Sequence, residues 1–467
     1  MSTATLTFQL HRASLHARTG TGTLSLLSIL SIAVGSTAAF LVAGGTWMFW
    51  VRAHHPELVT ESMRGTYGNE PDFLYTWFSL ALFACAFIVP ALFSLTAQAA
   101  VLGASGRERR LATLRLLGLS SRDVTRMTVI ETGIQAIIGI ALGLASSVLL
   151  APVFTNFEFQ DRPVELREIL LPWWGYLAVA ATLFFLALGA AFVGMQRVRV
   201  SPLGVARRST PPALKYWRLI AFVLLVAVVA VIVRNFDFNA AIASIAGMIG
   251  LLCIVVVSIN FVAPFLLQVA GHIVSLFPGT AHFVAWQRVA TNGKRAWRRV
   301  ASLAFFGFLA GYLVSSPLKQ DNLTLAMREE GDILTIFKDV STGALLTLLF
   351  GFILTGLSIF LGQASAAFEG AQLSRSLQLM GVPRRFHTAV NFIEIMGPAV
   401  GVSLLGFALG SPLAFIMFAS TGTDVDAAGR VLMALSFLGA GWGITLIAAL
   451  AAEPLRSRVL ASGRRHE

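Results

Sequence analysis

Two acidic residues, Glu131 and Glu394, lie inside long apolar segments of the sequence. An ionisable side chain in such a segment is a candidate for proton transfer or ion coupling, because a charge in hydrocarbon is costly unless it has a partner or a function. Each acid lies near one end of its segment, so it could instead anchor that end by snorkelling or by pairing with a cation such as Arg122 or Arg126. We favour anchoring, and proton coupling is the alternative.

Motifs for enzymatic chemistry are missing from the sequence. The pair Gly293-Lys294 lacks the neighbours that a phosphate-binding loop requires, and neither a zinc-protease motif nor a nucleophile elbow occurs. His54-His55 has no further metal ligand at a suitable spacing. Both cysteines, Cys85 and Cys253, lie in apolar runs rather than in loops. We therefore expect no catalytic residue, no metal site and no cofactor in this chain.

The segment Gly106–Asp123 has the pattern of a short amphipathic helix followed by a turn. Leu111, Leu114 and Leu117 recur at intervals of three residues and share one helix face. Gly118 suits a left-handed helix end, and the Ser120 to Asp123 spacing is that of a capping box for the next helix. Arginines are offset from the apolar face; they are Arg107, Arg110 and Arg115.

A second segment repeats this arrangement with different residues. Leu373, Leu377 and Met380 precede Gly381, and Pro383 stands where the first turn of the following helix is expected. Each copy predicts a short helix, a glycine turn and a long helix that enters the membrane. Such a joint could transmit a push from a cytosolic partner. Alternatively, the short helices rest on lipid headgroups.

The elements that position these segments are predicted to be membrane-spanning helices. Hydrophobic residues make up 56% of the 467 residues and charged residues only 12%, which excludes an ordinary soluble domain. A helix needs about 20 apolar residues to cross the hydrocarbon core. Such segments predict an all-α polytopic membrane protein with ten transmembrane helices, at 24–51, 73–102, 129–155, 170–194, 217–233, 240–275, 300–318, 341–364, 389–419 and 431–452.

The distribution of basic residues predicts the orientation. The net charge of +12 could suggest nucleic acid, but most of the 35 Lys and Arg residues fall in the connections on the side of the N-terminus. By the positive-inside rule, both termini are cytosolic, and the chain is a multi-pass protein of the cell membrane with no nucleic-acid partner. The opposite connections are about 20 residues long or shorter, so we expect no large extracytoplasmic domain.

An offset of 263 residues aligns Leu111–Leu150 with Ser374–Leu413 without a gap, and twelve of the forty positions are identical. This similarity predicts an internal parallel repeat in a 4+2+4 arrangement. The first four-helix repeat is 1–205, two linking helices occupy 206–280, and the second repeat is 281–467. Small-residue pairs suggest close helix packing, or alternatively a sliding seam between the repeats; the pairs are Gly139/Gly143, Gly307/Gly311, Gly397/Gly401 and Gly406/Gly410.

The run Arg109–Val124, followed by Glu131 and a glycine-bearing span, resembles the signature of the FtsX-like permease family. The run Leu377–Arg385, followed by Glu394, is a weaker copy. The resemblance implies the membrane subunit of an ABC transporter of the MacB or BceB kind, and a separate ATPase, in two copies, that supplies ATP and Mg. Residues that would couple to that ATPase are Arg110, Leu111, Leu114, Arg115, Leu117, Gly118, Arg122, Leu377, Gln378, Met380, Gly381, Arg384 and Arg385.

The resemblance also suggests the work done: export or extraction of a lipophilic or amphipathic substrate, such as an antimicrobial peptide. Family members usually carry a large extracytoplasmic domain, which neither Arg52–Asp72 nor Lys319–Asp339 could form. Two alternatives stay open. The chain could transmit a signal to a cell-wall hydrolase or sensor kinase without moving cargo, or it could be an ion-coupled secondary transporter that uses Glu131 and Glu394. Parallel rather than inverted repeats weaken the last reading.

Overall fold

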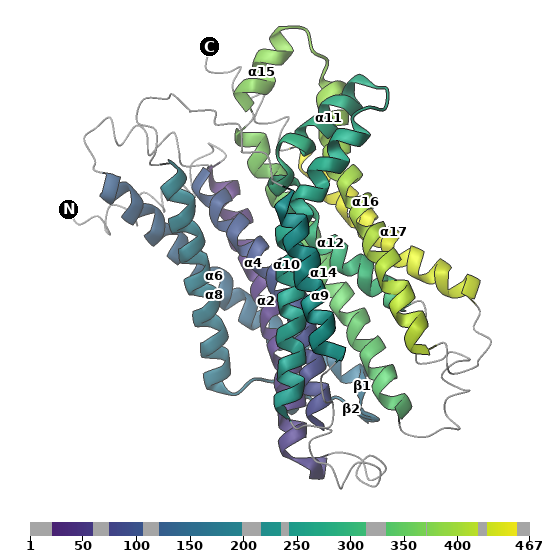
Figure 1. Cartoon of the computed structure of the whole chain (residues 1–467). Helices are drawn as coiled ribbons and strands as arrows, with labels where there is room; N and C mark the ends of the chain where they lie inside the picture. Colours follow the sequence, from purple (N-terminus) through teal and green to yellow (C-terminus); the bar gives the residue numbers. More distant parts are fainter. Residues whose placement is uncertain are drawn as a thin grey trace.

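The computed structural model describes residues 21–58, 74–105, 121–198, 216–234, 242–313, 333–369, 371–418 and 427–454. Within them the chain forms an elongated bundle of long helices (Figure 1). The long helices are α2 (Thr21–His54), α4 (Tyr75–Ser105), α6 (Ser121–Leu150), α8 (Trp173–Val198), α9 (Trp217–Arg234), α10 (Ile242–Val274), α12 (Gly293–Leu313), α14 (Ile333–Glu369), α16 (Arg384–Phe418) and α17 (Ala427–Ala451). The short elements are η1 (Pro56–Leu58), η3 (Ala151–Asn156), β1 (Glu158–Phe159), β2 (Arg162–Pro163), α7 (Leu166–Ile169), α11 (Thr280–Thr291) and α15 (Ala371–Leu379).

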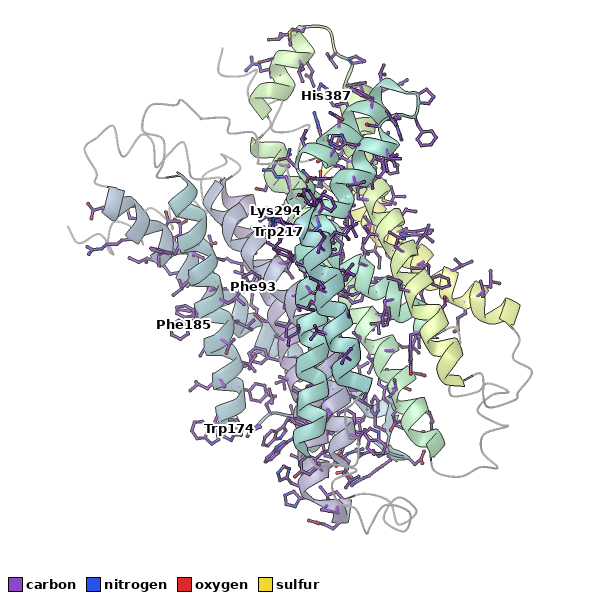
Figure 2. All side chains as sticks on the ribbon, in the orientation of Figure 1. Phe93, Trp174, Phe185, Trp217, Lys294 and His387 are labelled. Atoms are coloured by element: carbon purple, nitrogen blue, oxygen red, sulfur yellow. The ribbon has the colours of Figure 1, made fainter. Side chains whose placement is uncertain are left out.

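The length and composition of these helices make the protein an α-helical polytopic membrane protein. In the described part of the chain, seven helical segments are long and apolar enough to cross a membrane: Ser25–His54, Tyr75–Thr96, Arg126–Asn156, Trp173–Phe192, Lys338–Ala367, Arg385–Ser411 and Val431–Ala451. Large apolar side chains face outward along the bundle, as Trp174 and Phe185 do on α8 (Figure 2). Such side chains suit contact with lipid.

A helix lies at every one of the ten predicted spans, although α9, α10 and α12 are not among the seven segments. Helix α12 begins at Gly293, earlier than the residue 300 expected from hydropathy. Its first turns carry four basic residues, which a search for uncharged apolar segments leaves out of the predicted span; they are Lys294, Arg295, Arg298 and Arg299. Lys and Arg are nevertheless good helix formers, so the helix continues through them.

We name two groups of helices: the first group is α2, α4, α6 and α8, and the second is α12, α14, α16 and α17. The most extensive packing joins α2 to α6 and α12 to α16. Helix α6 begins at Ser121 and α16 at Arg384, positions that the offset of 263 residues aligns. The two groups therefore start this helix at equivalent residues.

Two glycines place these helix pairs in backbone contact. A Cβ atom on Gly143 would lie 3.0 Å from the backbone nitrogen of Thr37 on α2, and one on Gly406 would lie 2.9 Å from that of Phe308 on α12. Each Cβ would also strike a carbonyl oxygen, that of Ala33 or Ala304. The same close helix contact is built twice, as small residues allow.

Gly143 and Gly406 fit the favoured prediction of close helix packing and not the alternative of a sliding seam, because each packs two helices of the same group. The groups meet instead along α4 and α14. Leu354 and Leu361 of α14 are fully buried in one core cluster with Leu95 of α4. Another face of α14 packs against Phe306 of α12 in a second cluster. Helix α14 therefore belongs to both cores.

The contact between α4 and α14 contains polar groups as well. The Gln98 side-chain amide donates hydrogen bonds to Ser358 Oγ at 2.6 Å and to Ser94 Oγ at 2.9 Å. The Oγ atoms of Ser94 and Ser358 are 3.3 Å apart. These interhelical hydrogen bonds fix the register of the two helices where the groups meet.

The bundle has two distinct ends (Figure 1). One end, called the elbow end, carries α11 and α15, and the other, called the hairpin end, carries the antiparallel strands β1 and β2. The sequence did not predict this hairpin, whose two-residue strands give too short a pattern. Nor did it predict that Trp77 and Trp297, which lie near the ends of predicted spans, are buried and hydrogen-bonded within the protein.

Candidate functional site

A short helix, a glycine turn and a long helix form a joint at the elbow end, as predicted for residues 373–383. Helix α15 ends at Leu379, Gly381 has φ +89°, and α16 begins at Arg384, directly after Pro383. Backbone hydrogen bonds run from Gly381 N to Gln378 O at 3.0 Å and from Val382 N to Leu377 O at 3.1 Å. This pair of bonds with a left-handed glycine is the Schellman motif, which sets the angle at which the chain leaves a helix.

The side chains of this joint do not all lie on one side. Leu379 and Met380 are 82% and 72% exposed, whereas Leu377 is half-buried and lines a cavity beneath α15. Arg385 is exposed at the start of α16, and Gln378 is half-buried. Sequence periodicity grouped Leu377 with Met380 and missed Leu379, because it treated α15 as an isolated helix and ignored what lies beneath it.

The first predicted joint lies outside the described residues, and so do its candidate side chains. These are Arg110, Leu111, Leu114, Arg115, Leu117 and Gly118. Arg122 belongs to the first turn of α6, and Arg384 to the first turn of α16, but their side chains lie outside the described part too. Roles for these residues remain predictions.

Glu394 is held by two arginines rather than by a residue of its own helix. Its Oε1 atom is 2.7 Å from Arg299 Nη1, and its Oε2 atom is 3.4 Å from Arg288 Nη1. Arg299 belongs to α12 and Arg288 to α11, so the carboxylate ties three helices together at the elbow end. The equivalent Glu131 on α6 is 5% exposed. Both acids are thus largely removed from solvent by protein packing.

A cavity of about 480 Å³ opens next to this ion pair. Its walls come from α11, α12, α15, α16 and α17 and from the last turns of α14. Three arginines line it, Arg288, Arg295 and Arg299, together with the carboxylates of Glu394 and Glu453. His387, which Figure 2 places at the same end, is also part of the wall.

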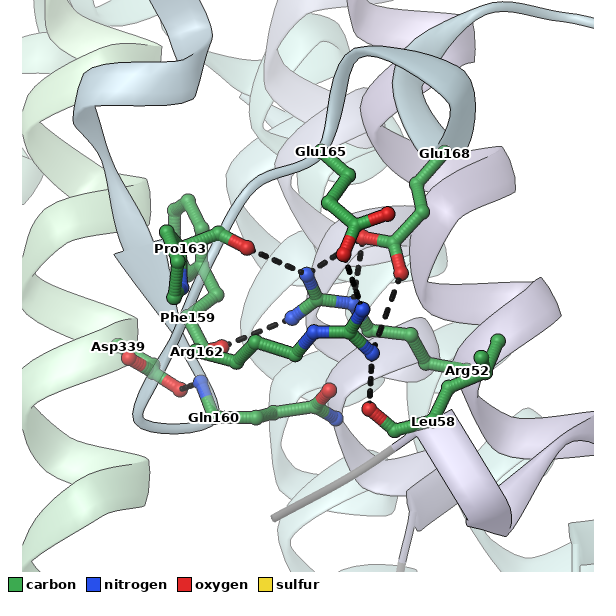
Figure 3. A network of polar contacts seen from close by, with 9 residues as sticks. All are labelled: Arg52, Leu58, Phe159, Gln160, Arg162, Pro163, Glu165, Glu168 and Asp339. Carbon is green, nitrogen blue, oxygen red and sulfur yellow. Dashed lines mark hydrogen bonds and ion pairs between the residues drawn. The ribbon is translucent and has the colours of Figure 1, made fainter.

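A second polar cluster lies at the hairpin end, and Figure 3 shows it from nearby. Arg52, at the end of α2, is only 1% exposed and pairs with Glu168 of α7 at 2.6 Å. Its Nη1 atom also donates to the carbonyl oxygen of Phe159 at 2.8 Å. Arg162 bonds Glu165 and the carbonyl of Leu58 nearby. A charge this deep is tolerated because its donors are satisfied.

The tip of the hairpin contacts α14 of the second group. Gln160 and Asp161 both have positive φ, 59° and 53°, the conformation of a two-residue hairpin turn. Asp339 of α14 accepts hydrogen bonds at 2.8 Å from the backbone of Gln160 and from the indole of Trp77 on α4. Lys338 Nζ lies 3.2 Å from Asp161. One carboxylate thus joins the hairpin, α4 and α14.

Sequence reasoning missed this second cluster. Arg52 follows the last apolar residue of its predicted span by one position, and Glu165 and Glu168 lie in the next outer connection, between the third and fourth spans. A basic residue at the outer end of a span, on the side that the positive-inside rule leaves poor in cations, was the available signal. Which acid would pair with it depends on folding and not on periodicity.

Comparison with families of known proteins gives one match, to the family described as FtsX-like permease C-terminal, over residues 81–203. This segment contains most of α4, the predicted first joint, and α6 and α8. This segment is similar to the C-terminal domain of FtsX-like permeases. The predicted resemblance is therefore confirmed over residues 81–203. A search of the curated proteins found no match to the chain.

FtsX-like permeases are membrane components of ABC-type systems that work with ATPase partners and are generally not catalytic themselves. In the matched segment, α4 ends at Ser105 and α6 begins at Ser121, and the predicted first joint falls between them in the sequence. In the second group, α15 lies between α14 and α16. The described joint therefore has the place in the chain order that the prediction gives to the first joint.

Proposed function

We propose that this chain is the permease subunit of an ATP-driven ABC transporter that exports or extracts a lipophilic or amphipathic substrate, such as an antimicrobial peptide. A separate ATPase hydrolyses ATP with Mg and drives the permease mechanically through the two joints. The observation that carries the proposal is α15 itself, which presents exposed Leu379 and Met380 and is fixed to α16 by a left-handed glycine.

The orientation follows from charge. The described residues at the elbow end include Arg288, Arg295, Arg298, Arg299 and Arg385, whereas basic residues at the hairpin end are matched by nearby acids. By the positive-inside rule, the elbow end faces the cytosol of a cell membrane. Exposed apolar side chains on a charged cytosolic surface suit a protein partner better than water.

The organisation of the chain is proposed to be ten spans in a 4+2+4 arrangement. Residues 1–205 and 281–467 form parallel four-helix repeats, and residues 206–280 supply the linking helices α9 and α10. The repeated backbone contact at Gly143 and Gly406 supports this division. Both termini are then cytosolic. Two joints per chain imply two ATPase copies per permease.

A route for mechanical transmission runs along α14. Its last turns line the cavity beside α15, and its second turn holds the hairpin tip through Asp339. A helix of 37 residues is about 55 Å long at 1.5 Å per residue, which is enough to link both ends of the bundle. Movement of α15 and α16 would reach the hairpin end through this helix and through the packed pair α12 and α16.

The test uses the full chain co-expressed with its ABC ATPase. Leu379→Ser with Met380→Ser should reduce co-purification of the ATPase, because it removes the exposed apolar face of α15. Gly381→Val should leave the ATPase bound but uncouple hydrolysis from transport, since a β-branched residue adopts positive φ only at a cost of about 1–2 kcal/mol. Gly118→Val, and Leu114→Ala with Leu117→Ala, are the corresponding changes in the first joint.

A matched control is Leu276→Ser with Phe277→Ser, because these residues are 84% and 63% exposed at the elbow end but are not part of the joint. This variant should bind and couple like the wild type. Normal binding and coupling by the α15 and Gly381 variants would refute the proposed docking site and would favour the reading in which α15 rests on headgroups.

A further inference from the structure

The cavity at the elbow end lies at the boundary of three candidate spans. Segments 338–367 and 431–451 end there, and segment 385–411 begins there. Ala367, Leu450 and His387, each within two residues of one of these boundaries, all line the cavity. Lipid phosphates occupy the zone just outside the hydrocarbon core, so the cavity opens at the depth of headgroups.

The walls of the cavity combine charged and small apolar side chains. Arg288, Arg295 and Arg299 come from α11 and α12. A group of small apolar residues from α14 and α17, which we call the apolar wall, consists of Ala366, Ala367 and Ala449. Three arginines against the carboxylates of Glu394 and Glu453 leave a surplus of positive charge. A guanidinium presents a planar fork of donors that matches a phosphate, which is why arginine is favoured at phosphate sites.

Size agrees with a ligand site. The volume of about 480 Å³ falls within the range of about 300–1,000 Å³ that is typical of small-molecule pockets. Arg299 and Glu394 are each 17% exposed, whereas Arg288 is 42% exposed. Arg295 is exposed as well. The pair of Arg299 and Glu394 is therefore partly withdrawn from water, whereas Arg288 and Arg295 are reachable from solvent.

We propose that this cavity binds the phosphate group of an anionic ligand, with the three arginines on the phosphate and the apolar wall against its hydrocarbon part. The ligand chemistry, a phosphate ester, could come from an anionic phospholipid of the adjacent leaflet or from a free phosphate compound. The proposed ATPase contact is the exposed pair Leu379 and Met380, neither of which lines this cavity, and the existence of the site does not depend on the proposed function.

Substitutions of Glu394 and of the arginines are expected to change anion binding in opposite directions. Its carboxylate occupies Arg299 and Arg288, so it competes with a phosphate for the same donors. Removing its charge should strengthen anion binding, whereas removing an arginine should weaken it. Leu377 of α15 lines the same cavity, so an occupant would touch the joint; only this last step rests on the proposed function.

The test measures lipid retention by native mass spectrometry on the full chain, released from nanodiscs of equal parts phosphatidylglycerol and phosphatidylcholine. We expect a preference for phosphatidylglycerol that falls about tenfold in Arg295→Gln, the factor that corresponds to one charge-assisted hydrogen bond. Arg295→Gln with Arg299→Gln should lose the preference. Glu394→Gln should increase it.

The control is Arg298→Gln. Arg298 is exposed on the same helix, donates a hydrogen bond to the backbone carbonyl of Lys294 and does not line the cavity. It should retain lipid like the wild type. A parallel arm adds inorganic phosphate to delipidated protein in neutral detergent and measures the thermal midpoint. Stabilisation by phosphate that Arg295→Gln abolishes, without a lipid preference, would assign the site to a free phosphate compound.

The proposal is overturned if the wild type shows neither effect, or if Arg298→Gln and Arg295→Gln change both measurements equally. Size-exclusion profiles identify variants that fail to fold. Arg295→Gln serves as the decisive variant because it leaves the ion pairs of Glu394 with Arg299 and Arg288 in place.

Discussion

Buried charges occur at both ends of the bundle, and each end compensates them differently. At the elbow end, Glu394 is shared between two arginines of other helices. At the hairpin end, Arg52 is almost fully enclosed and satisfied by Glu168 and by backbone carbonyls. Glu394 thus ties α11, α12 and α16 together, which suits the anchoring role that we favour for it.

Glu394→Gln is expected to leave the protein folded and at least partly active in ATP-driven transport. The amide can still accept a hydrogen bond from Arg299, so the helix contact survives in weakened form. Transport into proteoliposomes, measured with and without a protonophore, checks this expectation. Activity that depends on a proton gradient, needs no ATPase and disappears in Glu394→Gln would instead support an ion-coupled transporter.

Removing one partner of the enclosed pair should be costly. Arg52→Met removes the closest partner of the buried Glu168 and leaves it only the longer contact with Arg162, at 3.7 Å. Removing one partner of a buried pair typically costs about 3–5 kcal/mol. The double change Arg52→Met with Glu168→Leu should recover much of this loss, because no charge is stranded. Arg162→Met provides the comparison, because it keeps the close Arg52–Glu168 pair. It removes the contact with Glu165, which is 55% exposed, and the longer contact of 3.7 Å with Glu168. Exposed pairs contribute only about 0–1 kcal/mol, so we expect a smaller loss.

These costs would be read from thermal unfolding in detergent. A wild-type midpoint for Arg52→Met would show that water reaches the pair and that the enclosed environment does not persist in solution.

Among the helices, α6 and α16 are the pair whose construction is most alike in the two groups. They begin at aligned residues, and each presses a glycine onto the backbone of the first helix of its group. This contact leaves no room for a methyl group, so it fixes the distance between the helices. A pair packed in this way is expected to move as one body.

Gly406→Ala should weaken the second group strongly, because the new Cβ atom would collide with Ala304 O and lie 2.9 Å from Phe308 N. Overpacking of this kind costs about 1–3 kcal/mol or more. Gly401→Ala, on the same helix, is the matched control, since a Cβ atom there meets nothing within 4 Å. The two thermal midpoints should differ clearly; equal midpoints would mean that α12 and α16 are not in backbone contact.

Much of the arrangement of helices could be predicted from the sequence. The length of the apolar segments located the ten long helices of the described residues, and the offset of 263 residues paired α6 with α16, because both signals are local or repeated along the chain. The elbow joint at Gly381 was also predicted, since a glycine between two helical patterns is a local signal. The pairs Arg52–Glu168 and Gln160–Asp339 could not be predicted, because they join residues more than a hundred positions apart and have no periodicity.

For the whole molecule, the contact between α4 and α14 decides whether the two groups move relative to each other. Ser94→Cys with Ser358→Cys places two sulfurs where the Oγ atoms are 3.3 Å apart. In a background with Cys85→Ala and Cys253→Ala, oxidation should lock the groups together and stop ATP-driven transport. A reductant should restore it.

The control for this disulfide is Ser302→Cys with Thr355→Cys, because these side chains are 2.8 Å apart and both belong to the second group. Oxidising this pair should leave transport intact if each group moves as a unit. Full activity of the oxidised Ser94 and Ser358 variant would show that transport does not require the groups to separate along α4 and α14.

The hairpin makes the two helix groups unequal at the hairpin end of the bundle. Between α6 and α8 the chain builds η3, two strands and α7, whereas only residues 419–426 connect α16 to α17. Only the first of these connections is long enough to reach across to the opposite repeat, where it meets Asp339. In the proposed arrangement, two identical ATPase copies on the cytosolic side would thus act on two helix groups whose outer ends differ in structure. Equal movements on the cytosolic side would then open the outer ends of the two groups to different extents. A substrate would therefore pass preferentially beside one group.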